Sequence, residues 1–269
     1  MKEVVIATWN ISECIATYWD IKQEINYLNL DKMQNVFFEI TEMLNKHNID
    51  IVCFQEFPIN IPGTESLIDY IKNNTVLQHN YSVATCPSFL FEGGMVGISL
   101  FSKKELHNTE LVFFTNPNLT TTSETGKVYR SFDKGFLVAE CVYHEKKFSI
   151  VTGHSISFSP FGVRAENYPE SYIPLLDKVE ELYDQGNEIV VAGDFNTECL
   201  LKILPQLNDY LTDAIQGATT PIGIMEGKYY PCGRKLDYFL STSQIVVYQV
   251  DKIQNFSDHY LCVCHCIFT

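Results

Sequence analysis

The amino-acid sequence predicts an α/β (α+β) fold with four layers, in which two packed β-sheets lie between outer helices. Segments with the composition of β-strands heavily outnumber segments with helical periodicity. The two clear helical segments, residues 32–47 and about 164–185, take corresponding places in the two halves of the chain. Because each sheet and each helix must bury one face, helices covering the outer faces of two stacked sheets satisfy this order best. The 269 residues contain no linker or low-complexity tract, so we expect a single domain over residues 1–269.

In the first half of the chain, runs of apolar and β-branched residues predict the strands. Residues 3–9 form one strand in this prediction, and residues 49–54 form a second, buried one. Between them, apolar side chains recur at helical spacing at Met33, Val36, Phe37, Ile40, Met43 and Leu44. Three further strands are expected near residues 80–85, 95–102 and 109–114.

The second half begins with a predicted β-hairpin over about 135–156, whose turn lies at 144–147. Both of its arms are rich in residues that favour pleated structure. The helix at about 164–185 follows, with Gly186 just past its end as a stop signal. Strands are then expected at residues 189–193, 236–240, 245–250 and 260–268.

Charge and composition narrow the class of protein. The net charge is −14, and the only arginines are Arg130, Arg164 and Arg234. Tight binding to a duplex phosphate backbone depends on many Lys and Arg contacts, so a general duplex-DNA binder is disfavoured. A hydrophobic content of 46% excludes a disordered chain and allows a large core.

The cysteines and the apolar runs bear on the cellular compartment. Nine cysteines occur, an odd number without a CxxC pair, which favours a reducing compartment over a disulfide framework. Cys262, Cys264 and Cys266 would share one face of a strand, and we interpret them as small core residues. No run approaches the ~18 consecutive apolar residues of a membrane span, and no apolar leader precedes the first strand. We therefore expect an intracellular, cytoplasmic protein without a transmembrane segment or an obligate protein partner.

Polar residues that can bind metal or phosphate follow several of the predicted strands directly. They are found in TWN at 8–10, FQE at 54–56, GDFN at 193–196 and SDH at 257–259. A phosphodiester resists hydrolysis because its anionic oxygens repel a nucleophile, and a divalent metal offsets that charge. Mg²⁺ needs one or two carboxylates plus water and substrate oxygens, and these motifs offer such ligands. If the strands end at one rim of the sandwich, the sequence predicts a metal site that cleaves phosphate esters.

Each motif taken alone also fits a structural role. A glutamate after a strand is usually a surface residue, and an asparagine there often forms a turn. GDFN fits an ordinary β-turn, SDH fits a cap, and His154 fits a structural histidine. The ordered set, with every member at a strand end, favours catalysis.

This ordered set resembles the endonuclease/exonuclease/phosphatase superfamily, whose founding member is deoxyribonuclease I. The resemblance covers nearly the whole chain and adds His154 in VTGHS and Asp237 in KLDYFL to the four motifs. It implies a four-layer αββα sandwich of two mainly antiparallel sheets flanked by helices. It also implies a phosphoesterase that requires Mg²⁺ or Mn²⁺ and hydrolyses its substrate by in-line attack of water.

The resemblance assigns the metal to three residues. Asn10 and Glu56 match metal-binding positions of the family. Asp258 matches a further ligand or a neighbour that contacts the metal through water.

The resemblance assigns the chemical step to five residues. His259 matches the histidine that contacts the scissile phosphate or acts as general base, and Asp237 matches the carboxylate that orients it. Asp194 matches the residue that aligns or deprotonates the attacking water, and Asn196 matches its phosphate-binding companion. His154 matches the histidine that stabilises the pentavalent oxygens or protonates the leaving group. Whether His259 or Asp194 takes the proton stays open at this point.

Differences from the sequences typical of the family disfavour some of its subgroups. Abasic-site endonucleases of this fold typically have a tyrosine where this chain has His154, so that branch is disfavoured. Secreted deoxyribonucleases and toxin subunits carry signal peptides and disulfides, which this sequence does not suggest. Arg130 and Arg234 are candidates for substrate binding because they precede a strand and Asp237, respectively.

Several segments are candidates for setting specificity. They are the insertion at 11–31, Phe158 and Phe161 after His154, and the segment 227–235 with Tyr229 and Tyr230. Residues Phe89–Phe91 fit either a membrane-touching tip or a core contact. Aromatic rings at the rim could stack nucleobases, contact a lipid or sugar, or fill gaps between loops.

Three functions fit these observations. The first is a nuclease or phosphodiesterase acting on nucleic acid. The second is a phosphatase or phospholipase-type hydrolase acting on a small or lipid phosphoester, such as an inositol phosphate or sphingomyelin. The third is a binding protein that has lost catalysis, which the complete set of polar residues disfavours.

Overall fold

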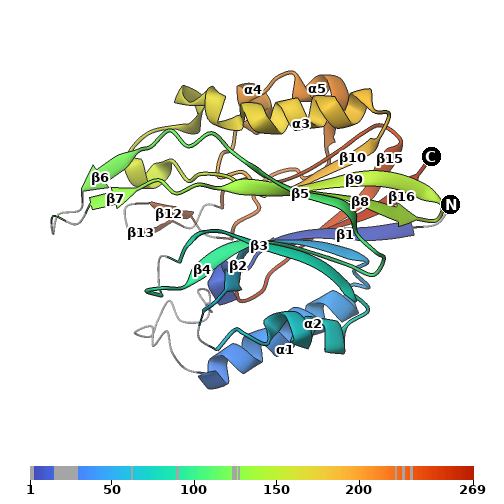
Figure 1. The fold of residues 1–269 in the computed structure, drawn as a ribbon, viewed down its shortest axis with the longest axis horizontal. Coiled ribbons are helices and arrows are strands. Elements are labelled where there is room, and N and C mark those ends of the chain that lie inside the picture. The colour runs from blue at the N-terminus through green and yellow to red at the C-terminus, as the bar shows by residue number, and fades with distance from the viewer. Residues whose placement is uncertain are drawn as a thin grey trace.

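The computed structural model describes residues 3–14, 30–61, 63–88, 91–122, 126, 128–221, 223–225, 228–230 and 233–269. Two six-stranded sheets stack face to face, and helices cover the outer face of each sheet (Figure 1). The predicted four-layer sandwich is therefore confirmed. No helix in this part of the chain is long and apolar enough to cross a membrane.

The first sheet has the strand order β15-β16-β1-β2-β4-β3. Its strands are β1 (Glu3–Asn10), β2 (Ile51–Ile59), β3 (His79–Pro87), β4 (Met95–Ser102), β15 (Ile245–Ile253) and β16 (Leu261–Phe268). β1 and β2 are parallel, and the other neighbouring strands are antiparallel. The chain therefore closes this sheet by returning its last strand to the side of its first.

The second sheet has the strand order β11-β14-β10-β9-β8-β5. Its strands are β5 (His107–Phe113), β8 (Gly135–Tyr143), β9 (Lys146–His154), β10 (Glu188–Asp194), β11 (Thr212–Asp213) and β14 (Asp237–Ser241). Here β9 and β10 form the parallel pair, and the remaining pairs are antiparallel. Two small hairpins lie outside the sheets, β6 (Thr120–Thr122) with β7 (Val128–Arg130), and β12 (Gly223–Met225) with β13 (Lys228–Tyr230).

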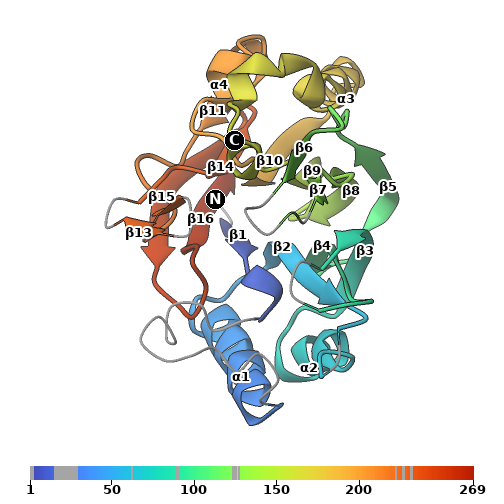
Figure 2. The same cartoon turned by 90° about the vertical axis from the view of Figure 1, so that its left-hand side faces the viewer.

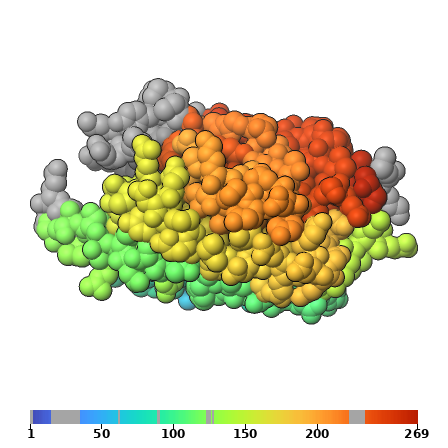
Figure 3. Space-filling model, turned by 90° about the horizontal axis from the view of Figure 1, so that it is seen from above, coloured from blue at the N-terminus to red at the C-terminus, as the bar shows by residue number. Residues whose placement is uncertain are grey.

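Helices form the two outer layers. α1 (Leu30–Lys46) and α2 (Leu67–Asn74) cover the first sheet, whereas α3 (Ile173–Asp184), α4 (Leu200–Ile203) and α5 (Leu207–Tyr210) cover the second (Figures 1 and 2). Figure 3 shows the second helical layer spread over one face of the molecule. α1 ends where Asn48 takes a left-handed φ of 50°, which lets the N–H of Ile49 bond the carbonyl of Leu44.

Apolar side chains fill the three spaces between the four layers. The core between the sheets contains Cys262, Cys264 and Cys266, all fully buried and free of disulfides. This confirms their interpretation as core residues. The other two cores join each sheet to its helices, with Trp9 and Phe54 on the α1 side and Phe136 and Phe195 on the α3 side.

The second predicted helix begins later than expected. Residues 165–172 form two 3₁₀ turns, Ala165–Asn167 and Pro169–Tyr172, and α3 begins only at Ile173. The reason is Pro169, whose ring disfavours the helical conformation for the residue before it. Tyr168 accordingly has φ −133° and ψ 52°. The short helix α2 was not predicted, because eight residues carry little periodic signal.

Candidate active site

The polar residues predicted at strand ends meet at one edge of the sandwich. A cavity of about 820 Å³ opens there, between the ends of the two parallel strand pairs. Nine of the ten predicted site residues line it: Asn10, Glu56, Arg130, His154, Asp194, Asn196, Arg234, Asp258 and His259. The tenth, Asp237, lies behind His259 and bonds to it.

Asn10 and Asp194 connect the two sheets at the floor of the cavity. Asn10 ends β1 and Asp194 ends β10, and the Nδ2 of Asn10 donates to the Oδ2 of Asp194 at 3.0 Å. The Oδ1 of Asn10 accepts from the backbone N–H of Ser12 at 2.9 Å. Residues 184 positions apart therefore share one buried hydrogen bond.

A β-bulge places Glu56. The register between β2 and β4 shifts between Gln55 and Phe57, and Glu56 has a left-handed φ of 49°. Phe54 and Phe57 both pack into the helix-side core although they lie three residues apart, so the bulge absorbs the extra residue. The strained backbone turns Glu56 into the cavity, where its side chain is 31% exposed.

Burial and like charge act together on Glu56. Burial, together with the charges of Asp258, Glu13 and Asp194 and against the opposing charge of Lys134, raises the pKa of the Glu56 carboxyl to about 7. Like charge on the neighbouring carboxylates therefore contributes to the raised pKa of Glu56.

Asp258 is held beside the end of β1. Its Oδ1 accepts hydrogen bonds from Ser12 and, at 3.3 Å, from Ser257. The Oγ of Ser257 also donates to the carbonyl of Asn10 at 2.6 Å. The loop before β16 is thereby fastened to β1, so Asp258 and Asn10 line the same cavity.

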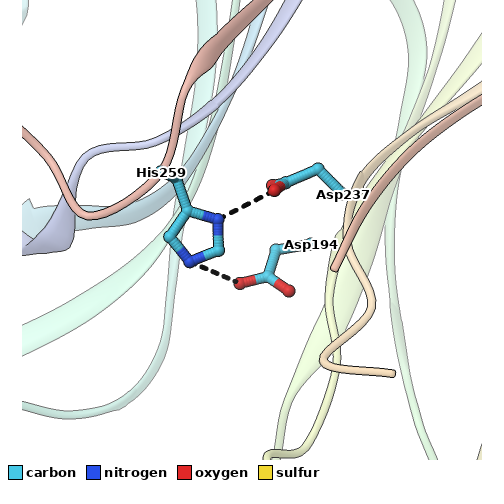
Figure 4. A group of neighbouring side chains, drawn as sticks. All are labelled: Asp194, Asp237 and His259. Atoms are coloured by element: carbon cyan, nitrogen blue, oxygen red, sulfur yellow. Dashed lines mark hydrogen bonds and ion pairs between the residues drawn. The ribbon is translucent and has the colours of Figure 1, made fainter. Parts of the chain in front are cut away.

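His259 lies between two carboxylates (Figure 4). Its Nδ1 bonds the Oδ2 of Asp237 at 2.8 Å, and its Nε2 faces the Oδ2 of Asp194 at 3.7 Å. Burial opposes a charge on the ring, but Asp237 and Asp194 outweigh it and raise the pKa of His259 well above its ordinary value. The ring is thus an imidazolium that presents its Nε2–H to the cavity.

Asp194 is held by its own loop as well as by Asn10. The backbone N–H of Asn196 donates to the Oδ1 of Asp194 at 2.8 Å, and the Nδ2 of Asn196 donates to the carbonyl of Ser155 at 3.0 Å. Burial raises the pKa of Asp194 to about 6, although His259 opposes the shift. The glycine of GDFN is required by packing, because a Cβ at Gly193 would lie 2.2 Å from the carbonyl oxygen of Gly153.

His154 ends β9 and faces both carboxylates of the floor. Its Nε2 lies 3.7 Å from the Oε1 of Glu56 and 3.8 Å from the Oδ2 of Asp194. Its Nδ1 lies 3.3 Å from the Nζ of Lys134, which can only donate. Burial, followed by the charges of Lys134 and His259, lowers the pKa of His154 well below its ordinary value. His154 is therefore neutral, with its proton on Nε2.

Sequence reasoning missed two charged residues that line the cavity, Lys134 and Glu13. Lys134 directly precedes β8 and is 7% exposed, and a lysine joined to a buried apolar run was a signal that could have found it. Glu13 is buried, lines the cavity and accepts a hydrogen bond from Ser88. It follows β1 in a turn of left-handed residues, which no sequence pattern announced.

The donor set fits a hard divalent cation. Lys134 and the imidazolium of His259 lie among the carboxylates Glu56, Asp194 and Asp258 at the floor, and Glu13 lines the same cavity. Carboxylate and amide oxygens are the ligands that Mg²⁺ and Mn²⁺ prefer.

One cluster, Asp194, Asp237 and His259, has ligand atoms within 4.8 Å of one another. The bond between His259 and Asp237 already uses one atom from each residue. The predicted metal ligands Asn10, Glu56 and Asp258 line the same cavity.

The predicted substrate-binding arginines line the mouth of the cavity and differ in their contacts. The Nε of Arg234 bonds the Oε1 of Glu198 at 2.6 Å. Arg130 is exposed at the end of β7. Arg164 does not line the cavity.

The aromatic residues predicted to set specificity lie in different surroundings. Phe158 is buried and stacks on Tyr168 at 5.3 Å, so its role is packing, whereas Phe161 lines the cavity. Phe91 packs in a small core, while residues 89 and 90 and most of the 11–31 insertion lie outside the described residues. The same holds for the side chains of Tyr229 and Tyr230.

Comparison with known proteins identifies the class. Residues 7–259 match the model of the Endonuclease/Exonuclease/phosphatase family, and the chain belongs to that family. No curated protein matches the sequence closely enough to count as a relative.

Several solved structures are similar in fold. The catalytic domain of human Nocturnin with a bound sulfate is 18% identical, with a TM-score of 0.68 over 99% of this chain and 94% of that one. TDP2 from Caenorhabditis elegans is 15% identical, with a TM-score of 0.65 over 100% of this chain and 75% of that one. TDP2 from D. rerio in complex with a single strand DNA product is 16% identical, with a TM-score of 0.63 over 99% and 100%. At these identities the likeness concerns the fold alone.

Proposed function

We propose that this protein is a phosphodiesterase that requires Mg²⁺ or Mn²⁺ and cleaves nucleic acid by in-line attack of water. The observation that carries the proposal is the position of Asp194. Its Oδ2 lies within 3.8 Å of Asn10, His154 and His259, which come from three different strands or loops. A water held by Asp194 would therefore lie beside two hydrogen-bond donors for the phosphate.

Asn10, Glu56 and Asp258 would hold the metal ion. When bound, the ion would neutralise phosphate charge and lower the pKa of a bound water. The excess of carboxylates around Glu56, whose pKa is raised to about 7, supports this assignment.

Asp194 would act as the general base. Its pKa of about 6 makes it a carboxylate at neutral pH and a stronger base than an ordinary aspartate. His259, as an imidazolium paired with Asp237, already carries its proton and would instead donate Nε2–H to a phosphate oxygen.

His154 and Asn196 would complete the contacts to the phosphate. Because the Nδ1 of His154 faces the Nζ of Lys134, its Nε2–H is free to donate to the pentavalent oxygens or to the leaving oxygen. Asn196 uses one amide hydrogen on Ser155 and has a second for the phosphate.

Nucleic acid is the proposed substrate because the arginines Arg130 and Arg234 flank the cavity of an otherwise acidic protein. The likeness to the TDP2 that was solved with a single strand DNA product supports the same class.

The test is a substrate panel of single-stranded DNA, duplex DNA, RNA, sphingomyelin and phosphoinositides with Mg²⁺. We expect turnover of nucleic acid that EDTA abolishes and that Asp194→Asn reduces at least about 10³-fold. Turnover confined to a lipid or an inositol phosphate would reject the substrate class. If no substrate of the panel is hydrolysed but one of them binds tightly, the proposal that this protein is an enzyme is rejected.

A further inference from the structure

The cavity extends well beyond the cluster of carboxylates and histidines. Its far side is formed by the β6–β7 hairpin, by the residues that follow it and by the 3₁₀ turn Ser159–Phe161. We call Tyr129, Arg130, Phe132 and Phe161 the hairpin wall. In Figure 1 the hairpin extends beyond the strands of the second sheet, and Figure 2 views the molecule from that side.

The hairpin wall differs in chemistry from the floor. All the carboxylates that line the cavity, Glu13, Glu56, Asp194 and Asp258, belong to the floor, whereas the wall consists of three aromatic side chains and one cation, with Phe132 also packed against the small core that contains Phe91. Tyr129 is 39% exposed, and Phe161 is partly exposed. Because the groups proposed for hydrolysis belong to the floor, the wall is placed to contact the group attached to the phosphate.

Aromatic side chains at such a surface bind planar rings by stacking. Stacking of a nucleobase on a protein ring typically changes affinity by about tenfold or more, and it accepts every base because each has a π-face. A lipid headgroup offers no such planar ring.

Arg130 adds a contact for an anion. It is exposed, and it forms no ion pair with any carboxylate that the structure describes, in contrast to Arg234, which is bound to Glu198 at 2.6 Å. Arg130 lies four residues before Lys134, so their Cα atoms are at most about 14 Å apart. One strand can therefore place its scissile phosphate at the floor and a neighbouring phosphate at Arg130.

We propose that the hairpin wall binds an unpaired nucleobase beside the scissile phosphate, while Arg130 pairs with a neighbouring phosphate of the same strand. In a duplex each base is already stacked and paired, so its faces cannot reach the wall. The net charge of −14 disfavours a long duplex contact in the same way. The substrate is then a single strand or an unpaired strand end. This inference rests on the proposed function.

The experiment compares three substrates: a single-stranded oligonucleotide, a blunt duplex that contains the same sequence, and bis(4-nitrophenyl) phosphate. The last contains a phosphodiester but no neighbouring phosphate. We expect kcat/KM for the single strand to exceed that for the duplex at least about tenfold. Arg130→Met should lower kcat/KM for the single strand about tenfold more than for bis(4-nitrophenyl) phosphate, mainly through KM. Phe161→Leu should reduce the preference for the single strand over the duplex.

The matched control is Arg164→Met, which removes an exposed arginine outside the cavity and should leave all three rates unchanged. Equal rates on single strand and duplex, or an Arg130→Met variant that loses no more on the oligonucleotide than on the small diester, would overturn the inference. Hydrolysis of the small diester in those cases would leave the proposed function standing. Hydrolysis of no diester at all would reject the proposed function itself. Arg130 is exposed, so its variant tests the inference even if Phe161→Leu fails to fold.

Discussion

Each sheet contains one parallel strand pair, β1–β2 in the first and β9–β10 in the second, and both pairs end at the cavity. The first pair delivers Asn10 and Glu56, and the second delivers His154 and Asp194. The side chain of Glu56 is 31% exposed and reaches the cavity through a bulge, whereas that of Asp194 is 2% exposed at the end of a regular strand.

The two ends differ in how completely their charges are balanced. Asp194 accepts a buried hydrogen bond from Asn10 and faces the imidazolium of His259, which is itself bonded to Asp237 and offsets the carboxylates. Around Glu56, the charges of Asp258, Glu13 and Asp194 raise the pKa of the carboxyl, and Lys134 opposes them. The same strand arrangement therefore yields one end where an imidazolium offsets the carboxylates and one where neighbouring carboxylates raise the pKa of Glu56, and it is at the second end that we propose the cation binds.

The largest effect, a loss of catalytic rate, is expected at Asp194 in the second strand pair. Asp194→Asn keeps the size of the side chain but removes the proposed base, so kcat should fall at least about 10³-fold. The measurement is the rate on a nucleic-acid substrate with saturating Mg²⁺, with thermal unfolding as the control for folding. A variant with more than a tenth of the normal rate would show that Asp194 is not the base.

A substitution at Asp237, the partner of His259, should lower the catalytic rate less. Asp237→Asn leaves His259 in place but removes its counter-charge, so kcat should fall about 10²-fold. The pKa of His259 should also fall toward its ordinary value, because the carboxylate that raises it most is gone. An NMR titration of the ring measures this shift, and an unchanged titration would contradict the assigned pairing.

Lys134 acts on both strand pairs, because it contacts His154 of the second pair and lowers the pKa of Glu56 in the first. Lys134→Met should lower kcat/KM about tenfold, since His154 loses the donor that keeps its proton on Nε2. Without the neighbouring cation the pKa of His154 should rise, while burial still holds it below the ordinary value. Lys134→Arg should restore most of the activity, and ¹⁵N shifts of the imidazole report the tautomer. Equal shifts in the methionine variant and the parent protein would disprove the role of Lys134.

The smallest effect is expected at Glu56 in the first strand pair, on the stability of the folded protein. In the folded protein the pKa of Glu56 is raised to about 7, so the carboxyl is harder to ionise there than in the unfolded chain. At pH 8 the folded state bears this cost, whereas at pH 4 the carboxyl is protonated in both states and no cost arises. Glu56→Gln should therefore stabilise the metal-free protein by about 1 kcal/mol at pH 8 and leave it unchanged at pH 4.

Thermal unfolding in EDTA at the two pH values measures this effect, and activity should be lost at the same time. Glu105→Gln, which replaces an exposed glutamate outside the cavity, is the control. If Glu56→Gln unfolds at a lower temperature than the parent protein at pH 8, burial and like charge do not destabilise the Glu56 carboxylate.

Much of the fold could be predicted because its signals are local. The period of the apolar residues in α1 and the apolar runs of β1, β2 and β10 are visible within a dozen residues. Features that depend on a single residue in context were missed. Pro169 delays α3 to Ile173, and the bulge at Glu56 leaves no mark in the sequence.

The sequence by itself determined which residues stand at the strand ends, because an apolar run followed by a polar residue is a local pattern. It also determined the family, because the order of the motifs survives without knowledge of their positions in space. The tertiary structure alone decided which of these groups carry charge. The pKa values of Asp194, His154 and His259 depend on burial between two sheets and on neighbours such as Lys134 and Asp237, which lie 20 or more positions away along the chain. Electrostatic energy depends on distance and solvent access, and only the packed sandwich defines both.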